Sequence, residues 1–245
     1  MPPKTNASGE RRKARNAVSP PGEATGPEAL PSTVMLLLEI AERLFAENGV
    51  EAVSLSRIVE EGGQRNRSAL HYHFGSRSGL VAQLLHMRLS HVNAIRHQYL
   101  DRLQQKGGAD DVHAVIHAAM RPIFDVVQQE PWGIYYVPVL AQTTLSPALK
   151  GFETIDPDAK DGLTRTFDLI RAALPDIPAA SLQMRFTFTM DTVIFTLART
   201  LRENGREGVT NALLGQLVDY GTAGITSTVT RGTKRQGGSR APVAK

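Results

Sequence analysis

Hydrophobic positions recur every three or four residues along most of the chain, the period of helices that bury one face. Residues 32–48 carry one such stripe, and Ser32 is a candidate N-cap. Gly49 suits the left-handed position that follows a helix. A longer helix is predicted from about Ser78 to Gln105, and another stripe follows from Val112 to Val127, with Asp110 or Asp111 as its cap.

Prolines interrupt the apolar pattern in the second half of the chain. Pro122 lies inside one stripe and Pro138 inside the segment from Pro131 to Leu145, so we expect kinked or divided helices there. The pairs Ser146-Pro147 and Asp156-Pro157 each have the order of an N-cap and a first helical residue.

The segment from Pro178 to Glu203 has two local interpretations. Its R-F-T-F-T-M run alternates like a strand, but apolar residues spaced three or four apart over more than twenty residues favour a helix. Phe188 and Phe195 lie on a second side of that helix, which predicts a surface for a partner chain. A last helix begins near Val209. The sequence therefore predicts an all-α fold of roughly nine or ten helices.

Charge is unevenly distributed. The net charge is +4, but residues 1–31 carry +2 and residues 221–245 carry +5, so the body between them is acidic. Both tails lack periodicity and are predicted to be disordered, from 1 to 31 and from 228 to 245. The break at Lys106-Gly107-Gly108-Ala109 divides the remainder into predicted domains at 32–105 and 106–227.

Missing features exclude several classes of protein. There are no cysteines, which removes disulfides and thiolate chemistry, and no apolar run reaches the length of a membrane span. We therefore expect a cytoplasmic protein without membrane contact. Because common catalytic motifs such as G-x-S-x-G and H-E-x-x-H are absent, we expect no enzyme, and no cofactor.

The stretch from Ser54 to Arg77 has the pattern of a helix-turn-helix. Leu55, Ile58 and Val59 face inward, Gly62-Gly63 makes a turn, and a second short helix follows. Residues 62–77 contain three arginines and no acid, a local basic patch suited to double-stranded DNA. The side chains expected to face DNA from this second helix are Arg65, Asn66, Arg67, Ser68, His71, Tyr72 and His73.

This stretch resembles the N-terminal domain of TetR-family transcriptional repressors. The resemblance covers about Val34 to Leu85 and is strongest in Leu44-Phe45-Ala46-Glu47-Asn48-Gly49 and in the run from Leu70 to Leu80. It implies that Ser54 and Arg77 contact phosphate and that residues 67–73 read the major groove, with His71 and Tyr72 facing the DNA backbone. The turn is one residue longer than is usual in the family, so which of Arg65, Asn66 and Arg67 contacts a base stays open.

The resemblance further implies a ligand-responsive transcriptional regulator, most simply a homodimeric repressor on a palindromic operator. A small apolar or aromatic effector would enter the C-terminal domain, shift the fourth helix and release the DNA. The alternatives are an activator, a regulator without a small-molecule switch, and a helical metal-dependent enzyme. An architectural DNA-binding protein is disfavoured, because residues 106–220 carry a net charge of −4.

An effector pocket needs an apolar lining with a few polar groups. Candidate lining residues are His117, Met120, Phe124, Trp132, Tyr135, Tyr136, Leu140 and Gln142. Ordinary core packing is the alternative for each of them. His113 and His117 share a helix face, but no third ligand stands at a suitable spacing, so we expect no metal site.

Overall fold

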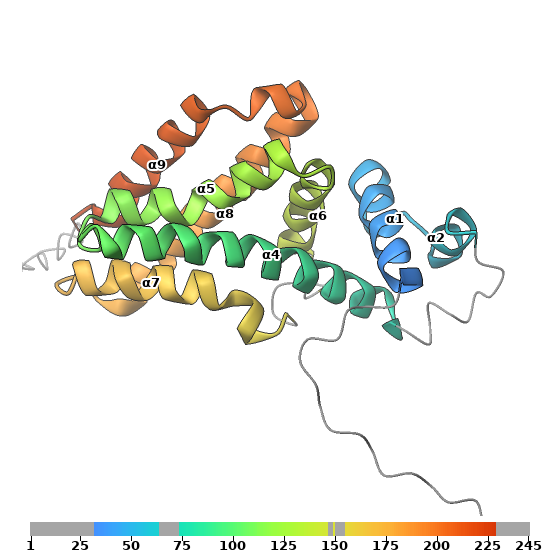
Figure 1. Cartoon of the computed structure of the whole chain (residues 1–245), viewed down its shortest axis with the longest axis horizontal. Coiled ribbons are helices and arrows are strands. Elements are labelled where there is room, and N and C mark those ends of the chain that lie inside the picture. The colour runs from blue at the N-terminus through green and yellow to red at the C-terminus, as the bar shows by residue number, and fades with distance from the viewer. Residues whose placement is uncertain (1–31, 64–73, 147–148, 150–154, 229–245) are drawn as a thin grey trace, which may run out of the picture. The chain divides into compact units, whose positions relative to one another are not determined.

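A computed structural model describes residues 32–63, 74–146, 149 and 155–228. In these ranges the chain forms α-helices and two short 3-10 helices and no strand, which confirms the predicted all-α fold (Figure 1). The α-helices are α1 (Ser32–Asn48), α2 (Leu55–Glu61), α4 (Arg77–Gln105), α5 (Val112–Gln129), α6 (Gly133–Leu145), α7 (Asp161–Ala173), α8 (Ala179–Asn204) and α9 (Asn211–Thr226). The 3-10 helices are η1 (Pro157–Lys160) and η2 (Arg206–Gly208).

The helix ends follow the sequence signals closely. Gly49 has a φ of +96°, Ser54 caps α2, and Asp111 is the residue that caps α5. Residues 178–203 form a helix, not a strand, because the long helical period outweighs the short alternating run. Of the two outcomes expected at Pro122 and Pro138, a division does not occur, since α5 and α6 each continue through their proline; a kink there stays a prediction. Asp156-Pro157 does begin a helix, but it is the 3-10 helix η1.

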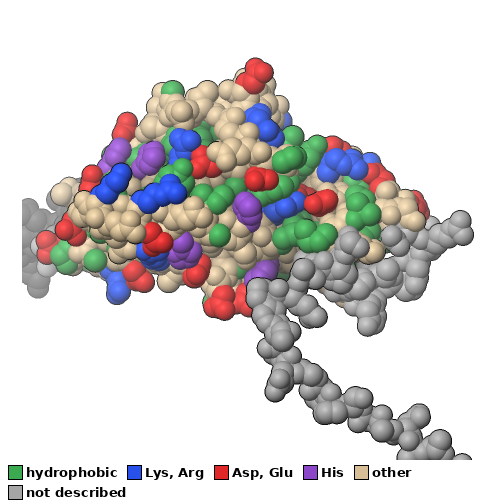
Figure 2. Space-filling model, in the orientation of Figure 1, with side chains coloured by type: hydrophobic (Ala, Val, Ile, Leu, Met, Phe, Trp, Pro, Cys, Tyr) green, Lys and Arg blue, Asp and Glu red, His purple; other side chains and the backbone are tan. Residues whose placement is uncertain are grey.

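The helices surround one core. Helix α5 packs against α4 on one side and α9 on another, and its predicted apolar stripe is buried. Helix α6 lies between α8 and α1, so it contacts both a C-terminal helix and the first helix of the chain (Figure 1). Within the described ranges, no helix combines the length and hydropathy needed to cross a bilayer. Figure 2 shows acidic and basic side chains interspersed over the visible face of these residues.

Candidate functional site

Helices α1 and α2 and the loop between them are the described part of the helix-turn-helix; we call them the frame. Ser54 Oγ accepts a hydrogen bond from the Arg57 backbone amide at 3.1 Å, which fixes the start of α2. Ile58 and Val59 are buried against α1. Most of the predicted DNA-reading residues lie outside the described residues, namely Arg65, Asn66, Arg67, Ser68, His71, Tyr72 and His73.

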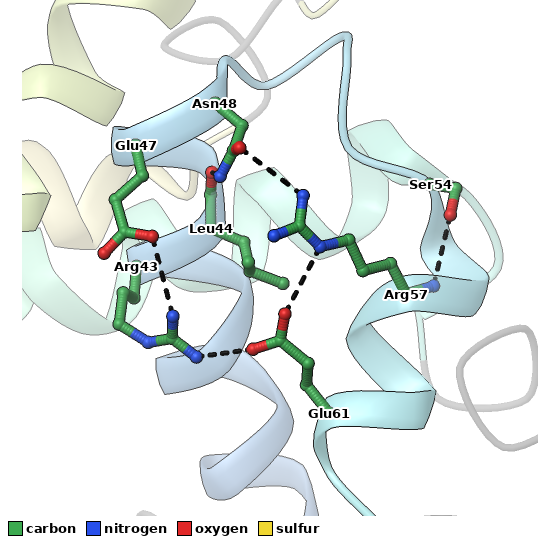
Figure 3. A network of polar contacts seen from close by, with 7 residues as sticks. All are labelled: Arg43, Leu44, Glu47, Asn48, Ser54, Arg57 and Glu61. Carbon is green, nitrogen blue, oxygen red and sulfur yellow. Dashed lines mark hydrogen bonds and ion pairs between the residues drawn. The ribbon is translucent and has the colours of Figure 1, made fainter.

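A surface network joins α1 to α2 on one side of this frame (Figure 3). Glu61 accepts from Arg43 Nη2 at 2.6 Å and from Arg57 Nε at 3.2 Å, and Arg57 also donates to Asn48 Oδ1 at 3.4 Å. The hydrogen bond from Arg43 lowers the pKa of the Glu61 carboxyl, so the acid stays ionised at neutral pH. The network therefore occupies Arg57 with protein partners.

Arg77 begins α4 and reaches back to the loop between α1 and α2. Its Nη1 donates to the Val50 carbonyl and, at 2.6 Å, to the Val53 carbonyl. These bonds set where α4 starts relative to the helix-turn-helix. The phosphate contact implied for Arg77 stays a prediction, and it must coexist with this structural role.

A second set of contacts joins the helix-turn-helix to the C-terminal helices; we call it the junction. It consists of the Glu42–Arg88 pair with Trp132, and of Gln142 with the backbone it binds. Arg88 of α4 donates to the Glu42 carboxylate of α1 through Nε at 3.1 and 3.0 Å and through Nη2 at 2.6 Å. Both side chains are almost fully buried.

Burial and the hydrogen bonds of the junction act on the pKa of Glu42 in opposite directions, and two further contacts join the helices there. Burial raises the pKa of Glu42 to about 6, and the hydrogen bonds from Arg88 act in the opposite direction. The Arg88 guanidinium lies 4.2 Å from the ring centroid of Trp132, a cation–π contact. On α6, Gln142 accepts from the Val50 amide at 2.8 Å and donates to the Phe45 carbonyl at 3.2 Å.

A cavity of about 880 Å³ lies among α4, α5, α6, α7 and α8. This volume is within the usual range for pockets that hold small molecules. The lining is mainly apolar and aromatic, with Leu89, Val92, Ile123, Leu140, Leu163, Phe167, Phe186, Met190, Val193 and Ile194. The charged residues in it are Arg96, Lys160 and Asp191.

The predicted effector residues divide into two groups. Met120, Tyr136 and Leu140 line the cavity. His117, Phe124, Trp132, Tyr135 and Gln142 do not belong to the described lining. Phe124 is a core residue, while Trp132 and Gln142 belong to the junction.

Arg96 is the functional candidate that sequence reasoning missed. It lies on the buried side of α4 and is 4% exposed. A signal existed, because Leu85, Leu89, Val92, Arg96 and Leu100 recur at helical spacing, which places an arginine within an apolar stripe. An arginine at such a position needs an explanation, since buried charges are costly.

The histidines of α5 do not gather a metal site. His113 Nε2 lies 3.0 Å from Asp219 Oδ1 of α9, and burial lowers the pKa of the His117 imidazole. Among the described residues there is no group of three or more side chains arranged to hold a metal ion.

Comparison with known proteins identifies both parts of the chain. Residues 37–84 match the family model for bacterial regulatory proteins of the tetR family. Residues 117–224 match the model for a tetracyclin repressor-like C-terminal domain. No curated protein is similar enough to the sequence to count as a match.

Several solved structures share the fold. A tetR-family transcription regulator from Shewanella sp. PV-4 is 16% identical, with a TM-score of 0.57, over 78% of this chain and 96% of that chain. FadR from Bacillus subtilis, solved with stearoyl-CoA, is 14% identical, with a TM-score of 0.56, over 78% and 98%. A TetR-family regulator from Marinobacter aquaeolei VT8 is 14% identical, with a TM-score of 0.53, over 79% and 95%.

These likenesses agree with the helix-turn-helix frame and the all-α body behind it. The two family models together span the N-terminal helices and most of the C-terminal ones. The chain therefore belongs to the TetR family of transcriptional regulators.

Proposed function

We propose that this regulator is a homodimeric repressor that binds a palindromic operator and releases it when a small, largely apolar molecule enters the cavity. The observation that carries the proposal is the double role of α6. Its residues Tyr136, Leu140 and Thr143 line the cavity, and its Gln142 binds the backbone of the helix-turn-helix frame. A ligand that moves α6 therefore also moves that frame.

The junction offers a second route between cavity and frame. Tyr136 lines the cavity, and its ring meets the edge of Trp132 at a centroid distance of 5.8 Å. Trp132 in turn contacts Arg88, whose partner Glu42 belongs to α1. Operator binding by a dimer requires two recognition helices about 34–36 Å apart, so small movements of each frame change the fit. FadR, which shares this fold, was solved with stearoyl-CoA, and this supports an effector with an apolar chain.

DNA binding is tested by selecting fragments of the source genome that the full-length protein retains. We expect a palindromic site, and we expect Arg67→Ala to weaken binding to it by about 1–3 kcal/mol with a blunted sequence preference. Arg171→Ala is the matched control, because Arg171 is exposed on α7 and pairs only with Asp168 in the described structure. If Arg67→Ala bound the operator as tightly as the wild type does, and scrambled DNA likewise, the proposed role of Arg67 in DNA reading would be contradicted. A reporter gene behind the operator separates repression from activation.

The dimer is proposed to form through α8 and α9. Met184, Phe188 and Tyr220 are large hydrophobic side chains with 57%, 61% and 65% of their surfaces exposed. Such side chains on neighbouring helices are typical of an interface. Phe188→Asp should yield monomers in sedimentation velocity, whereas Gln105→Asp at the exposed end of α4 should not. An unaltered sedimentation coefficient for Phe188→Asp would contradict this interface.

A further inference from the structure

The cavity contains a buried arginine that does not form an ion pair in the described structure. Arg96 lines the cavity from α4 and is 4% exposed. Its Nε donates to the Ala119 carbonyl at 2.9 Å, and its Nη1 donates to Asn93 Oδ1. Both acceptors are neutral. Burial lowers the pKa of the Arg96 guanidinium to about 10, so it remains a cation at neutral pH.

No carboxylate of the described residues forms a salt bridge with this cation. Asp161 attracts Arg96 at longer range, but its own Oδ1 lies 3.0 Å from His97 Nε2 and its side chain is 58% exposed. A buried charge without a counter-ion is costly, and an anion that arrives with a ligand removes much of that cost. The guanidinium also offers a geometry suited to carboxylate and phosphate oxygens.

The rest of the polar lining favours the same ligand. Lys160 is a second cation, and Asp191 is the carboxylate. Burial raises the pKa of Asp191, which weakens it as a counter-ion. Thr143 and Thr144 donate their hydroxyl hydrogens to the Leu140 carbonyl. Their hydroxyl hydrogens are therefore already used within the protein.

We infer that the effector is an anionic amphiphile, with an extended apolar body in the cavity and a carboxylate or phosphate group paired with Arg96. This inference rests on the proposed ligand-responsive function and specifies its ligand. The apolar body contacts residues such as Leu89, Phe167 and Phe186, and the charge selects among molecules of similar shape. A neutral compound leaves Arg96 without a counter-ion, and a cationic one meets it with like charge.

The test compares four probes that share one alkyl chain: dodecanoate, dodecyl phosphate, dodecanol and dodecyltrimethylammonium. Binding to the full-length protein is measured by calorimetry below the micelle-forming concentration of each probe. We expect at least one anionic probe to bind about tenfold or more tightly than dodecanol, because hydrogen bonds between charged groups are the strong ones. Comparison of the two anionic probes shows which head group the site prefers.

Arg96→Gln should reduce the ratio of anionic-probe to dodecanol affinity to about threefold or less, while dodecanol still binds. Arg121→Gln is the matched control, because Arg121 is a half-buried arginine of α5 that pairs with Asp125 and lies outside both the cavity lining and the junction. It should leave the ratio unchanged even if it lowers stability. Melting curves for both variants confirm folding before the titrations.

The outcomes separate this inference from the function on which it rests. Equal binding of dodecanol and both anionic probes by the wild type overturns the inference and leaves a ligand-responsive regulator in place. Tighter binding of the ammonium probe also overturns it, in favour of Asp191 as the recognising group. Binding of no probe overturns the inference of a chain-bearing anion, and the proposed ligand response is then left to ligands without an alkyl chain. Should Arg96→Gln fail to fold, the wild-type comparison still decides whether the cavity prefers an anionic head group, and Arg96→Lys takes the place of the variant.

Discussion

Helices α4 and α6 contribute to both the junction and the cavity. The two regions differ in whether a buried arginine has a carboxylate partner within the protein. At the junction, the cation of Arg88 meets the carboxylate of Glu42, and Gln142 satisfies two backbone groups of the helix-turn-helix frame. In the cavity, the acceptors that Arg96 has among the described residues are a carbonyl and an amide oxygen, both neutral. The buried cation of the junction is thus neutralised by the protein, whereas the cation of the cavity can pair with an anionic ligand.

Position along α4 separates the two roles. Arg88 and Arg96 are eight residues apart on the buried side of the helix, so they lie on a similar face about two turns apart. Arg88 lies opposite α1, while Arg96 lies opposite α5 and the cavity. Helix α4 therefore carries Arg88, which stabilises the junction, and about two turns later Arg96, which we propose pairs with the ligand.

The largest loss of stability is expected when the ion pair of the junction is removed. Arg88→Met should lower the free energy of unfolding by about 3–5 kcal/mol, because it leaves the Glu42 carboxylate buried without its cation. Arg96→Met should cost clearly less, since no carboxylate loses an ion-pair partner there. Urea unfolding followed by circular dichroism measures both variants.

A double variant provides the control. Glu42→Gln combined with Arg88→Met removes the stranded charge, so it should regain much of the stability lost in Arg88→Met alone. Equal losses for Arg88→Met and Arg96→Met would show that the two arginines are not different in kind, and the contrast between junction and cavity would fail.

Sequence reasoning predicted the architecture well and the cavity poorly. Helix ends depend on local chemistry, and Gly49, Ser54 and Asp111 identify them from a few neighbouring residues. Pro122 was expected to kink or divide its helix, and α5 is undivided, because packing of α5 against α4 and α9 offsets a lost backbone hydrogen bond. Membership of the TetR family was predicted from the helix-turn-helix motif, which is also a local pattern.

The cavity depends on which helices meet, and no local pattern gives that. Trp132 and Gln142 are of the residue types expected to contact a ligand. The structure places them instead on the side of the α5–α6 region that faces the frame. Phe167 and Phe186 line the cavity from α7 and α8, a pairing that appears only when the helices are packed. Arg96 was detectable in principle, as a charge within an apolar stripe.

A smaller effect tests the hydrogen-bonded part of the junction. Gln142→Ala should cost about 1–2 kcal/mol, because the amide of Val50 and the carbonyl of Phe45 both lose a partner. Hydrogen exchange at the Val50 amide should accelerate. Gln128→Ala is a matched control, since Gln128 also binds two backbone groups, in this case the carbonyls of Arg206 and Val209, and these lie far along the sequence from the frame. Faster exchange at Val50 in both variants would point to general loosening and would contradict a specific link through α6.

The smallest effect is expected outside the junction, in the exposed network between α1 and α2. Arg57→Ala removes the side-chain contacts to Glu61 and Asn48, but exposed ion pairs are screened by water and salt, and Glu61 keeps Arg43 as a partner. The stability change should be close to the limit of measurement. Ser54→Ala, by contrast, removes the cap of the same helix and should cost about 1 kcal/mol. If Arg57→Ala proved as costly as Ser54→Ala in the same urea titration, the frame would depend on surface charge, and burial would no longer explain why the junction is the stronger link.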